Sequence, residues 1–283
     1  MNDATLGRFL ILLRREMWES NRLFVASPAV LTGLLLVAML WTLLQVPTEM
    51  KAEALQQAGA YLDGVSPIDL SPAFMVAAIP FVAVLYICSV IYLVNALYHD
   101  RKDSSVLFWQ SMPVSNLATV LAKVVTVCVV APLFTALASG ILILIAVIAV
   151  SILGAGYEVE ISGVWPLLGA GIYSIVLIYL TALLGSLWLL PMVGWILLFS
   201  AYARSLPFLW ALGAFILLVL LEDFVFGTQF LGNWVESRTG FYNYLVFSIG
   251  DFFQRLFSYD MLIGIVLGAV LLAGAVNMRR FTD

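Results

Sequence analysis

The chain has 283 residues, of which 63% are hydrophobic and only 11% are charged, and its mean hydropathy is +1.07. Soluble domains contain about 45–50% apolar and about 25% charged residues, so this composition excludes a soluble globular protein and a disordered one. The net charge of -4 gives no basic surface of the kind that binds nucleic acid. We therefore predict a single all-α, polytopic membrane domain over residues 1–283.

The first 22 residues precede any apolar run and predict an amphipathic helix. Apolar residues recur there at helical spacing, and Arg15 and Glu19 are placed to pair one turn apart. Such a helix is typical of segments that lie in the membrane interface. We expect this one on the cytoplasmic side.

Six apolar segments follow that are long enough to cross a membrane, which takes about 20 residues each. We expect spans at 23–46, 73–97, 118–153, 164–190, 205–221 and 261–278. The stretch 161–221 contains one charge, Arg204, and its length also admits three spans. Pro132 and Pro191 lie inside apolar segments and predict bends there.

The positions of Lys and Arg favour six spans, because these residues concentrate in cytoplasmic segments. With six spans, both termini are cytoplasmic and only Lys51, Arg238 and Arg255 lie outside. The cytoplasmic set is Arg8, Arg14, Arg15, Arg22, Arg101, Lys102, Lys123, Arg204, Arg279 and Arg280.

Two features concern the outer side and the last span. Residues 222–260 are crowded with aromatic side chains, which favour headgroup depth, so we expect short interfacial or re-entrant helices there. Gly264 and Gly268 form a small-xxx-small step that permits close approach of another helix. That contact can lie within the subunit or between subunits.

Residues typical of catalysis or metal binding are scarce. None of the three lysines follows a glycine, so a phosphate-binding loop of the Walker type is excluded. His99 is the only histidine, and Cys88 and Cys128 both lie inside apolar runs. We predict that the chain is not an enzyme and contains no metal site or cofactor.

The loop over residues 98–117, YHDRKDSSVLFWQSMPVSNL, carries the most information. Charges of alternating sign run from Asp100 to Asp103, and an apolar patch follows at Val106, Leu107, Phe108 and Trp109. Pro113 ends this patch, and Ser115 or Asn116 can cap the next helix. Exposed apolar residues of this kind indicate a protein contact or a helix lying on lipid headgroups.

This loop resembles the coupling loop of ABC transporter permeases of the type-2 exporter class. The elements that match are an acidic-basic start, an apolar helix and a "PVS"-like end at Pro113 to Ser115, with Lys123 soon after. The basic-acidic cluster around Arg15 and Glu16 resembles that family's N-terminal helix. Many members have an "ER…GT" pattern where this chain has Asp100-Arg101 and Ser104-Ser105, which leaves the individual contacts open.

The resemblance implies a permease that dimerises, with itself or with a related chain, in a bacterial inner membrane. A separate cytoplasmic ATPase would bind ATP and Mg, and this chain would carry the coupling contacts. The implied contact residues are Asp100, Arg101, Lys102, Asp103, Val106, Leu107, Phe108, Trp109, Met112, Pro113, Arg15 and Glu16.

The resemblance also implies a substrate path at the subunit interface, where Trp41, Tyr86, Tyr92 and Phe215 are the expected residues. A path poor in charge suits a lipid, a lipid-linked glycan, a hydrophobic peptide or a drug. Two other functions remain open from the residues alone. The chain can be a membrane anchor that recruits a cytoplasmic partner through the same loop, or an ion-coupled secondary carrier.

Overall fold

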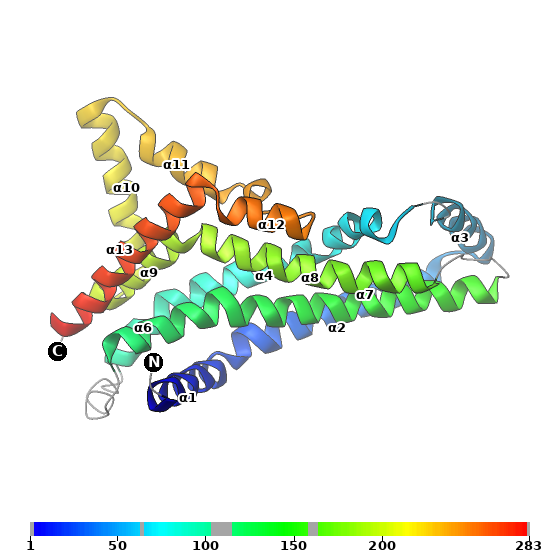
Figure 1. Ribbon diagram of the computed structural model, residues 1–283, viewed down its shortest axis with the longest axis horizontal. Helices are drawn as coiled ribbons and strands as arrows, with labels where there is room; N and C mark the ends of the chain where they lie inside the picture. Colours follow the sequence, from blue (N-terminus) through cyan, green and yellow to red (C-terminus); the bar gives the residue numbers. More distant parts are fainter. Residues whose placement is uncertain (1–2, 63–64, 103–114, 158–163, 282–283) are drawn as a thin grey trace.

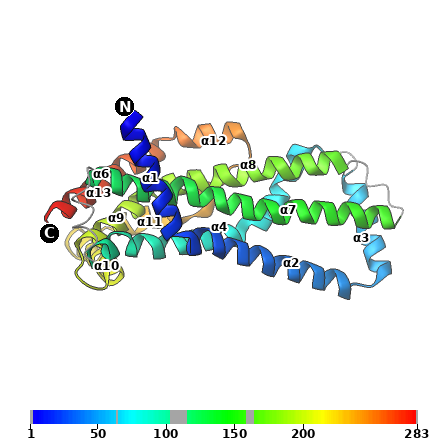
Figure 2. The ribbon, with the colours of Figure 1, turned by 90° about the horizontal axis from the view of Figure 1, so that it is seen from below.

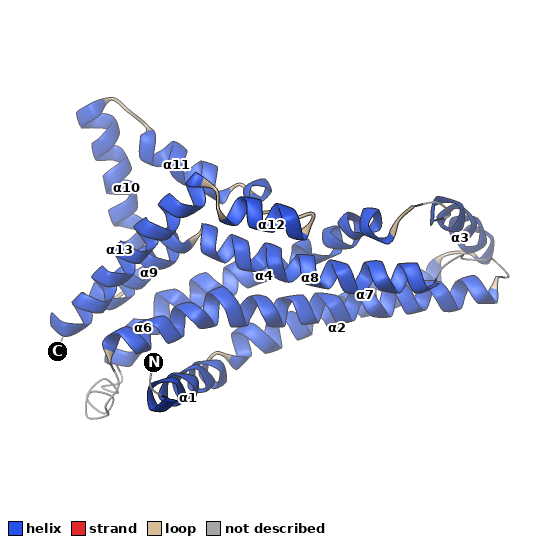
Figure 3. Cartoon of the chain, in the orientation of Figure 1, coloured by secondary structure: helices blue, strands red, loops and turns tan. Residues whose placement is uncertain are grey.

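The computed structural model describes residues 3–62, 65–102, 115–157 and 164–281. Every regular element among these residues is helical (Figure 3). The N-terminal half contains α1 (Asp3–Glu19), η1 (Arg22–Ala26), α2 (Ser27–Gln45), α3 (Thr48–Leu62), α4 (Pro67–Lys102), α6 (Asn116–Val125), η2 (Thr126–Val130) and α7 (Ala131–Gly156). The C-terminal half contains α8 (Val164–Trp188), α9 (Leu190–Tyr202), α10 (Pro207–Phe226), α11 (Phe230–Thr239), η3 (Phe241–Asn243), α12 (Ile249–Leu256) and α13 (Tyr259–Phe281).

The described residues form six helical segments that are long and apolar enough to cross a membrane, as many as the sequence predicts. They are Arg22–Gln45, Asp69–Asp100, Asn116–Gly156, Trp165–Trp188, Pro207–Phe226 and Tyr259–Arg279. The chain is thus a multi-pass, all-helical membrane protein. One further apolar helix, α9, has only 13 residues and was not predicted from the sequence as a separate helix.

The long helices form a bundle with both termini at one end and α3 at the other (Figure 1). α7 lies between α2 and α8, while α4 packs against both α7 and α8. At the end that holds the termini, α1 runs across the direction of the long helices (Figure 2). The position of α1 in the membrane interface stays a prediction.

Two spans contain a π-helical turn, one at the start of the first span and one ten residues into the third, and a proline lies two residues after the end of each turn. η1 precedes Pro28 and η2 precedes Pro132, and both prolines occupy the first turn of the next helix. A proline has no N–H to donate to the carbonyl four residues earlier, and its ring crowds that carbonyl. The wider π turn accommodates both effects. The bend predicted at Pro132 has this form.

The second predicted bend, at Pro191, is an interruption of one residue, Leu189, whose amide still donates to the Gly185 carbonyl at 2.9 Å. α8 ends at Trp188, and α9 starts at Leu190 with Pro191 in its first turn. α9 then packs closely on α13. A short turn leads to α10, which stands apart from the bundle (Figure 1). Only 6% of the most apolar window of α10 is buried, against 50% for α8.

Short helices return the chain from α10 to α13, and their predicted interfacial or re-entrant position stays a prediction. α11 follows α10, and α12 carries an N-cap in which the Ser248 hydroxyl accepts a hydrogen bond from the Asp251 amide at 3.1 Å. Arg238, at the end of α11, is buried between the rings of Trp188 and Trp234. Desolvation by this burial lowers the pKa of Arg238, although the nearby Asp260 opposes the shift.

Candidate functional site

A buried ion pair joins the N-terminal helix to the third span. Lys123 Nζ on α6 lies 3.1 Å from Oε1 and 3.2 Å from Oε2 of Glu16 on α1. Both side chains are only 2% exposed. A charge that is removed from water in this way is costly unless it is paired and hydrogen-bonded, so this contact fixes α1 against α6.

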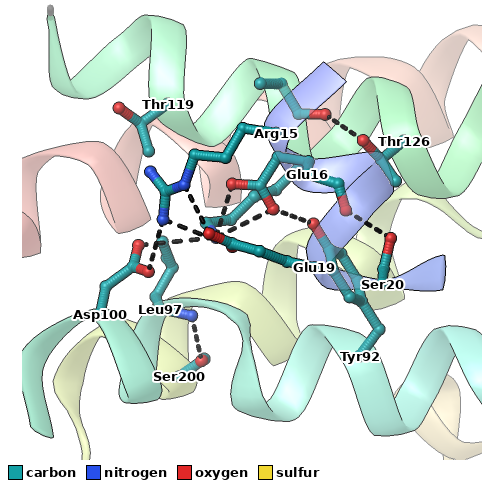
Figure 4. Close-up of polar contacts among 12 residues, drawn as sticks. Arg15, Glu16, Glu19, Ser20, Tyr92, Leu97, Asp100, Thr119, Thr126 and Ser200 are labelled. Carbon is teal, nitrogen blue, oxygen red and sulfur yellow. Dashed lines mark hydrogen bonds and ion pairs between the residues drawn. The ribbon is translucent and has the colours of Figure 1, made fainter. Parts of the chain in front are cut away.

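Asp100, near the end of α4, extends the pair into a cluster. Its carboxylate lies 3.5 Å from Lys123 Nζ, 3.8 Å from Arg279 Nη2 and 4.0 Å from Arg15 Nη2. Figure 4 shows the residues of α1 converging on Asp100 and on Tyr92 of α4. Three carboxylates (Glu16, Glu19 and Asp100) thus face three cations (Arg15, Lys123 and Arg279), and their formal charges cancel.

Tyr92 completes the bonding of Glu16. Its hydroxyl donates to Glu16 Oε2 at 2.6 Å (Figure 4). The Tyr92 ring packs edge-on against Phe24, with ring centroids 5.3 Å apart. Tyr92 therefore links the charged cluster to the apolar core beneath it. Tyr92 was expected on the substrate path, and the structure places it in this cluster.

Arg15 forms the outer edge of the cluster. Its guanidinium donates to Glu19, with Nε 2.6 Å from Oε1, which confirms the ion pair predicted from their spacing. Partial burial disfavours the charged form of Arg15. The hydrogen bond and charge of Glu19, assisted by Glu16 and Asp100, outweigh it and raise the pKa of Arg15 above its usual value. Arg15 therefore stays charged at any physiological pH.

A cavity of about 280 Å³ adjoins the cluster. The residues with polar side chains that line it are Glu16, Glu19, Ser20, Tyr92, Asn95, His99, Asp100 and Lys123. In the described part of the chain, no group of three or more His, Cys, Asp or Glu side chains could bind a metal ion. The charged groups are bonded mainly to one another, so the arrangement is suited to joining helices rather than to catalysis.

The cluster's position in the chain gives it functional interest. Asp100 lies two residues before the end of α4, and Lys123 lies in α6, the next described helix. The Ser115 hydroxyl caps α6 by accepting from the Ala118 amide at 3.2 Å. Both helices that flank the predicted coupling loop are thus tied to α1 and, through Arg279, to α13.

The predicted coupling residues fall into three groups. Arg15, Glu16 and Asp100 come together in the cluster. Arg101 and Lys102 form the last turn of α4, where Lys102 is exposed. The remaining ones, Asp103, Val106, Leu107, Phe108, Trp109, Met112 and Pro113, lie outside the described residues.

The structure does not bring the other predicted path residues together. Trp41 is exposed on α2. Tyr86 lies within the bundle, edge-on to Tyr244 of the outer segment, with ring centroids 6.1 Å apart. Phe215 lines a cavity beside α10, which is described below.

The partners of Lys123 and Arg279 were not predicted from the sequence. The signal for Lys123 was its position inside a predicted span, since a charge there requires a partner. Nothing in the sequence specifies that partner, because Glu16 is 107 residues away. Comparison of the chain with known protein families, curated proteins and solved structures finds no match.

Proposed function

We propose that the chain is the membrane-spanning permease subunit of an ABC transporter of the type-2 exporter class, driven by a separate ATPase. The observation that supports this proposal is the buried cluster of Glu16, Lys123 and Asp100. It joins both helices that flank the 98–117 loop to the N-terminal helix. A transporter powered by a soluble partner needs such a rigid connection between its docking surface and its spans.

The contacts suggest how motion would reach the spans. A partner that displaces the loop would move α4 and α6, and the cluster would carry α1 and α13 with them. Breaking a buried pair by removing one partner costs about 3–5 kcal/mol, so the four helices would move as a unit. Such rigid-body motion is one of the standard ways in which two distant sites are coupled.

α9 would join this movement through Ser200. Its hydroxyl accepts from the Leu97 amide at 3.1 Å (Figure 4). It also accepts from the Tyr98 amide at 3.2 Å and donates to the Val94 carbonyl at 2.8 Å. These bonds fix the end of α9 to α4 close to the cluster. Motion of α4 would therefore also shift α9 and the helices packed against it.

The substrate class follows from the lining of the spans. Apart from residues at the two ends, the candidate spans contain few charges, and the exposed faces of α2 and α10 are almost entirely apolar. A path along such faces fits a lipid, a lipid-linked glycan, a hydrophobic peptide or a drug. The path would form between this chain and a second permease copy.

The proposal is tested by isolating the chain with its partner. We would purify it in mild detergent from its native membrane and assay the preparation for ATP hydrolysis. The variant Phe108→Ala/Trp109→Ala removes the expected anchors of the loop, and loss of such buried aromatic anchors typically costs 2 kcal/mol or more of binding. We expect an ATPase to co-purify with the wild-type chain and not with the double variant.

Trp165→Ala/Phe224→Ala is the matched control. It also removes one Trp and one Phe, both strongly exposed and outside the loop, and it should retain the ATPase. Absence of an ATP-hydrolysing partner from the wild-type preparation would exclude the proposal. Transport that is independent of ATP and stops when an ion gradient is dissipated would identify a secondary carrier instead. If a partner binds but hydrophobic substrates do not change its ATPase rate, the membrane anchor would be favoured.

A further inference from the structure

A cavity of about 400 Å³ lies between α9, α10, α11 and α13. Every residue that lines it has an apolar or aromatic side chain, including Trp195, Phe208, Leu212, Phe215, Trp234 and Leu271. Its volume falls in the range of ligand pockets, about 300–1,000 Å³. A cavity of this size without polar groups suits a hydrocarbon and offers nothing to bind water.

The cavity exists because α11 acts as a strut between α10 and the rest of the bundle. At the start of α11, the Glu222 carboxylate on α10 accepts hydrogen bonds from the Phe230 amide at 2.7 Å and the Leu231 amide at 2.8 Å. It also accepts one from the Thr228 hydroxyl at 2.9 Å. An acidic side chain that caps amides at a helix N-terminus is a favourable arrangement.

The other end of α11 is fixed by Arg238. Its guanidinium donates to the Trp188 carbonyl at 2.9 Å and to the Asp260 carbonyl, and it stacks between the rings of Trp188 and Trp234. The Trp188 indole in turn donates to the Arg238 carbonyl at 3.1 Å. The strut thus runs from α10 to the place where α8 ends and α13 begins, and it holds α10 away from the bundle.

The opposite end of the cavity is fixed by the turn between α9 and α10. Leu206 adopts a left-handed conformation there, with φ of 48°, which is strained for a side chain of its size. Trp195 Nε1 on α9 donates to the Ala211 carbonyl on α10 at 3.0 Å. With both ends fixed, the cavity is a preformed feature of the fold.

The length and charge of the site indicate what occupies it. The lining residues on α10 run from Phe208 to Leu218, which at 1.5 Å per residue is about 15 Å. That is about half of the 30 Å hydrocarbon core of a bilayer, the reach of one acyl chain. Arg204, the only charge between residues 161 and 221, lies exposed in the turn between α9 and α10, four residues before Phe208 in the sequence.

We propose that this cavity binds one anionic phospholipid, with an acyl chain against α9, α10 and α13 and the phosphate at the Arg204 guanidinium. A guanidinium matches the geometry and charge of a phosphate group. The proposal does not rest on the transport function and holds equally for an anchor or a carrier. It explains why α10 is fixed at a distance from its neighbours.

The test measures lipid retained by the purified full-length chain. The chain would be extracted in mild detergent into a mixture of phosphatidylglycerol and phosphatidylcholine and analysed by native mass spectrometry. We expect one phosphatidylglycerol per chain in the wild type. Leu212→Trp, which fills the cavity, and Arg204→Gln, which removes the charge, should each lower its occupancy about tenfold.

Two controls match these variants. Leu209→Trp adds the same bulk one turn from the α9–α10 junction but outside the lining, and Lys51→Gln removes a cation at a distance. Both should retain the lipid. A second measurement uses the wild-type chain. Phosphatidylglycerol with a photoreactive diazirine in its acyl chain should crosslink to the cavity residues of α9 and α10.

Several results would overturn the proposal. These are retention of phosphatidylglycerol by Leu212→Trp at the wild-type level, equal retention of phosphatidylcholine, or diazirine labelling spread evenly over all exposed spans. If Leu212→Trp instead separates a dimer without changing the bound lipid, the cavity is a subunit interface and the lipid site is wrong.

Discussion

Burial of both members of the Glu16–Lys123 ion pair makes each of them hard to replace alone. Lys123→Met keeps an unbranched side chain one atom shorter but leaves the Glu16 carboxylate buried beside Asp100 without its main cation. We expect this variant to lower the free energy of unfolding by about 3–5 kcal/mol. The detergent-purified chain would be heated to a series of temperatures. The fraction that still elutes in the monodisperse peak of size-exclusion chromatography would report the change in stability.

Two further variants separate burial from charge. Glu16→Gln/Lys123→Met removes both charges and should recover most of the lost stability, because no unpaired buried charge remains. Glu19→Gln breaks an ion pair whose carboxylate side chain is 51% exposed and should cost about 0–1 kcal/mol. A Lys123→Met chain that unfolds at the wild-type temperature would show that the pair does not stabilise the fold.

For individual residues, contacts between near neighbours in the sequence can be predicted, and contacts between distant residues cannot. The Arg15–Glu19 pair follows from helical spacing, which places residues four apart on one face. The pairing of Lys123 with Glu16 depends on how α1 folds back against α6, and no local pattern encodes that. Sequence could therefore indicate that Lys123 needs a partner but could not name it.

At the scale of helices, α9 and α13 approach so closely that two glycines are required. A Cβ on Gly268 would lie 2.9 Å from the Leu190 carbonyl carbon, and a Cβ on Gly194 would lie 3.0 Å from the Gly268 carbonyl oxygen. Backbone cannot give way as a side chain can. We expect Gly268→Ala to destabilise the chain by about 1–3 kcal/mol in the same unfolding measurement.

Gly213 on α10 provides the matched control. A Cβ built there meets nothing within 4 Å, so Gly213→Ala should be neutral or stabilise by up to about 1 kcal/mol through helix propensity. Equal effects of the two substitutions would contradict the close packing of α9 on α13.

The same helices mark the limit of prediction from composition. The Gly264 and Gly268 step indicates a close approach, and the structure places both contacts within the subunit, with Gly268 against Leu190 and Gly264 against Arg238. The separate helix α9 was missed because the stretch 161–221 has no charge until Arg204 to mark an end. Pro191 was the only signal, and the bend that it predicted lies where α8 gives way to α9.

For the whole molecule, the number of spans is predictable because the membrane itself sets the length of an apolar helix. Their arrangement is not, since α8 and α10 have the same mean hydropathy of 2.2 but very different burial, 50% and 6%. Hydropathy reports whether a helix can lie in the membrane. Whether it packs inside the bundle or stands apart depends on short contacts such as those of Glu222 and Arg238.

The orientation of the whole bundle is predicted by the distribution of Lys and Arg and can be measured with single cysteines. Gln57 is exposed on α3 and Lys102 is exposed at the end of α4, at opposite ends of the bundle (Figure 1). The native Cys88 and Cys128 are buried, so they should give little background labelling. A membrane-impermeant maleimide applied to intact spheroplasts should label Gln57→Cys and leave Lys102→Cys unlabelled, because the positive segments stay inside. After permeabilisation both should react, which shows that Lys102→Cys is accessible in itself. Labelling of Lys102→Cys before permeabilisation would invert the topology and place the charge cluster outside, where no cytoplasmic ATPase could reach it.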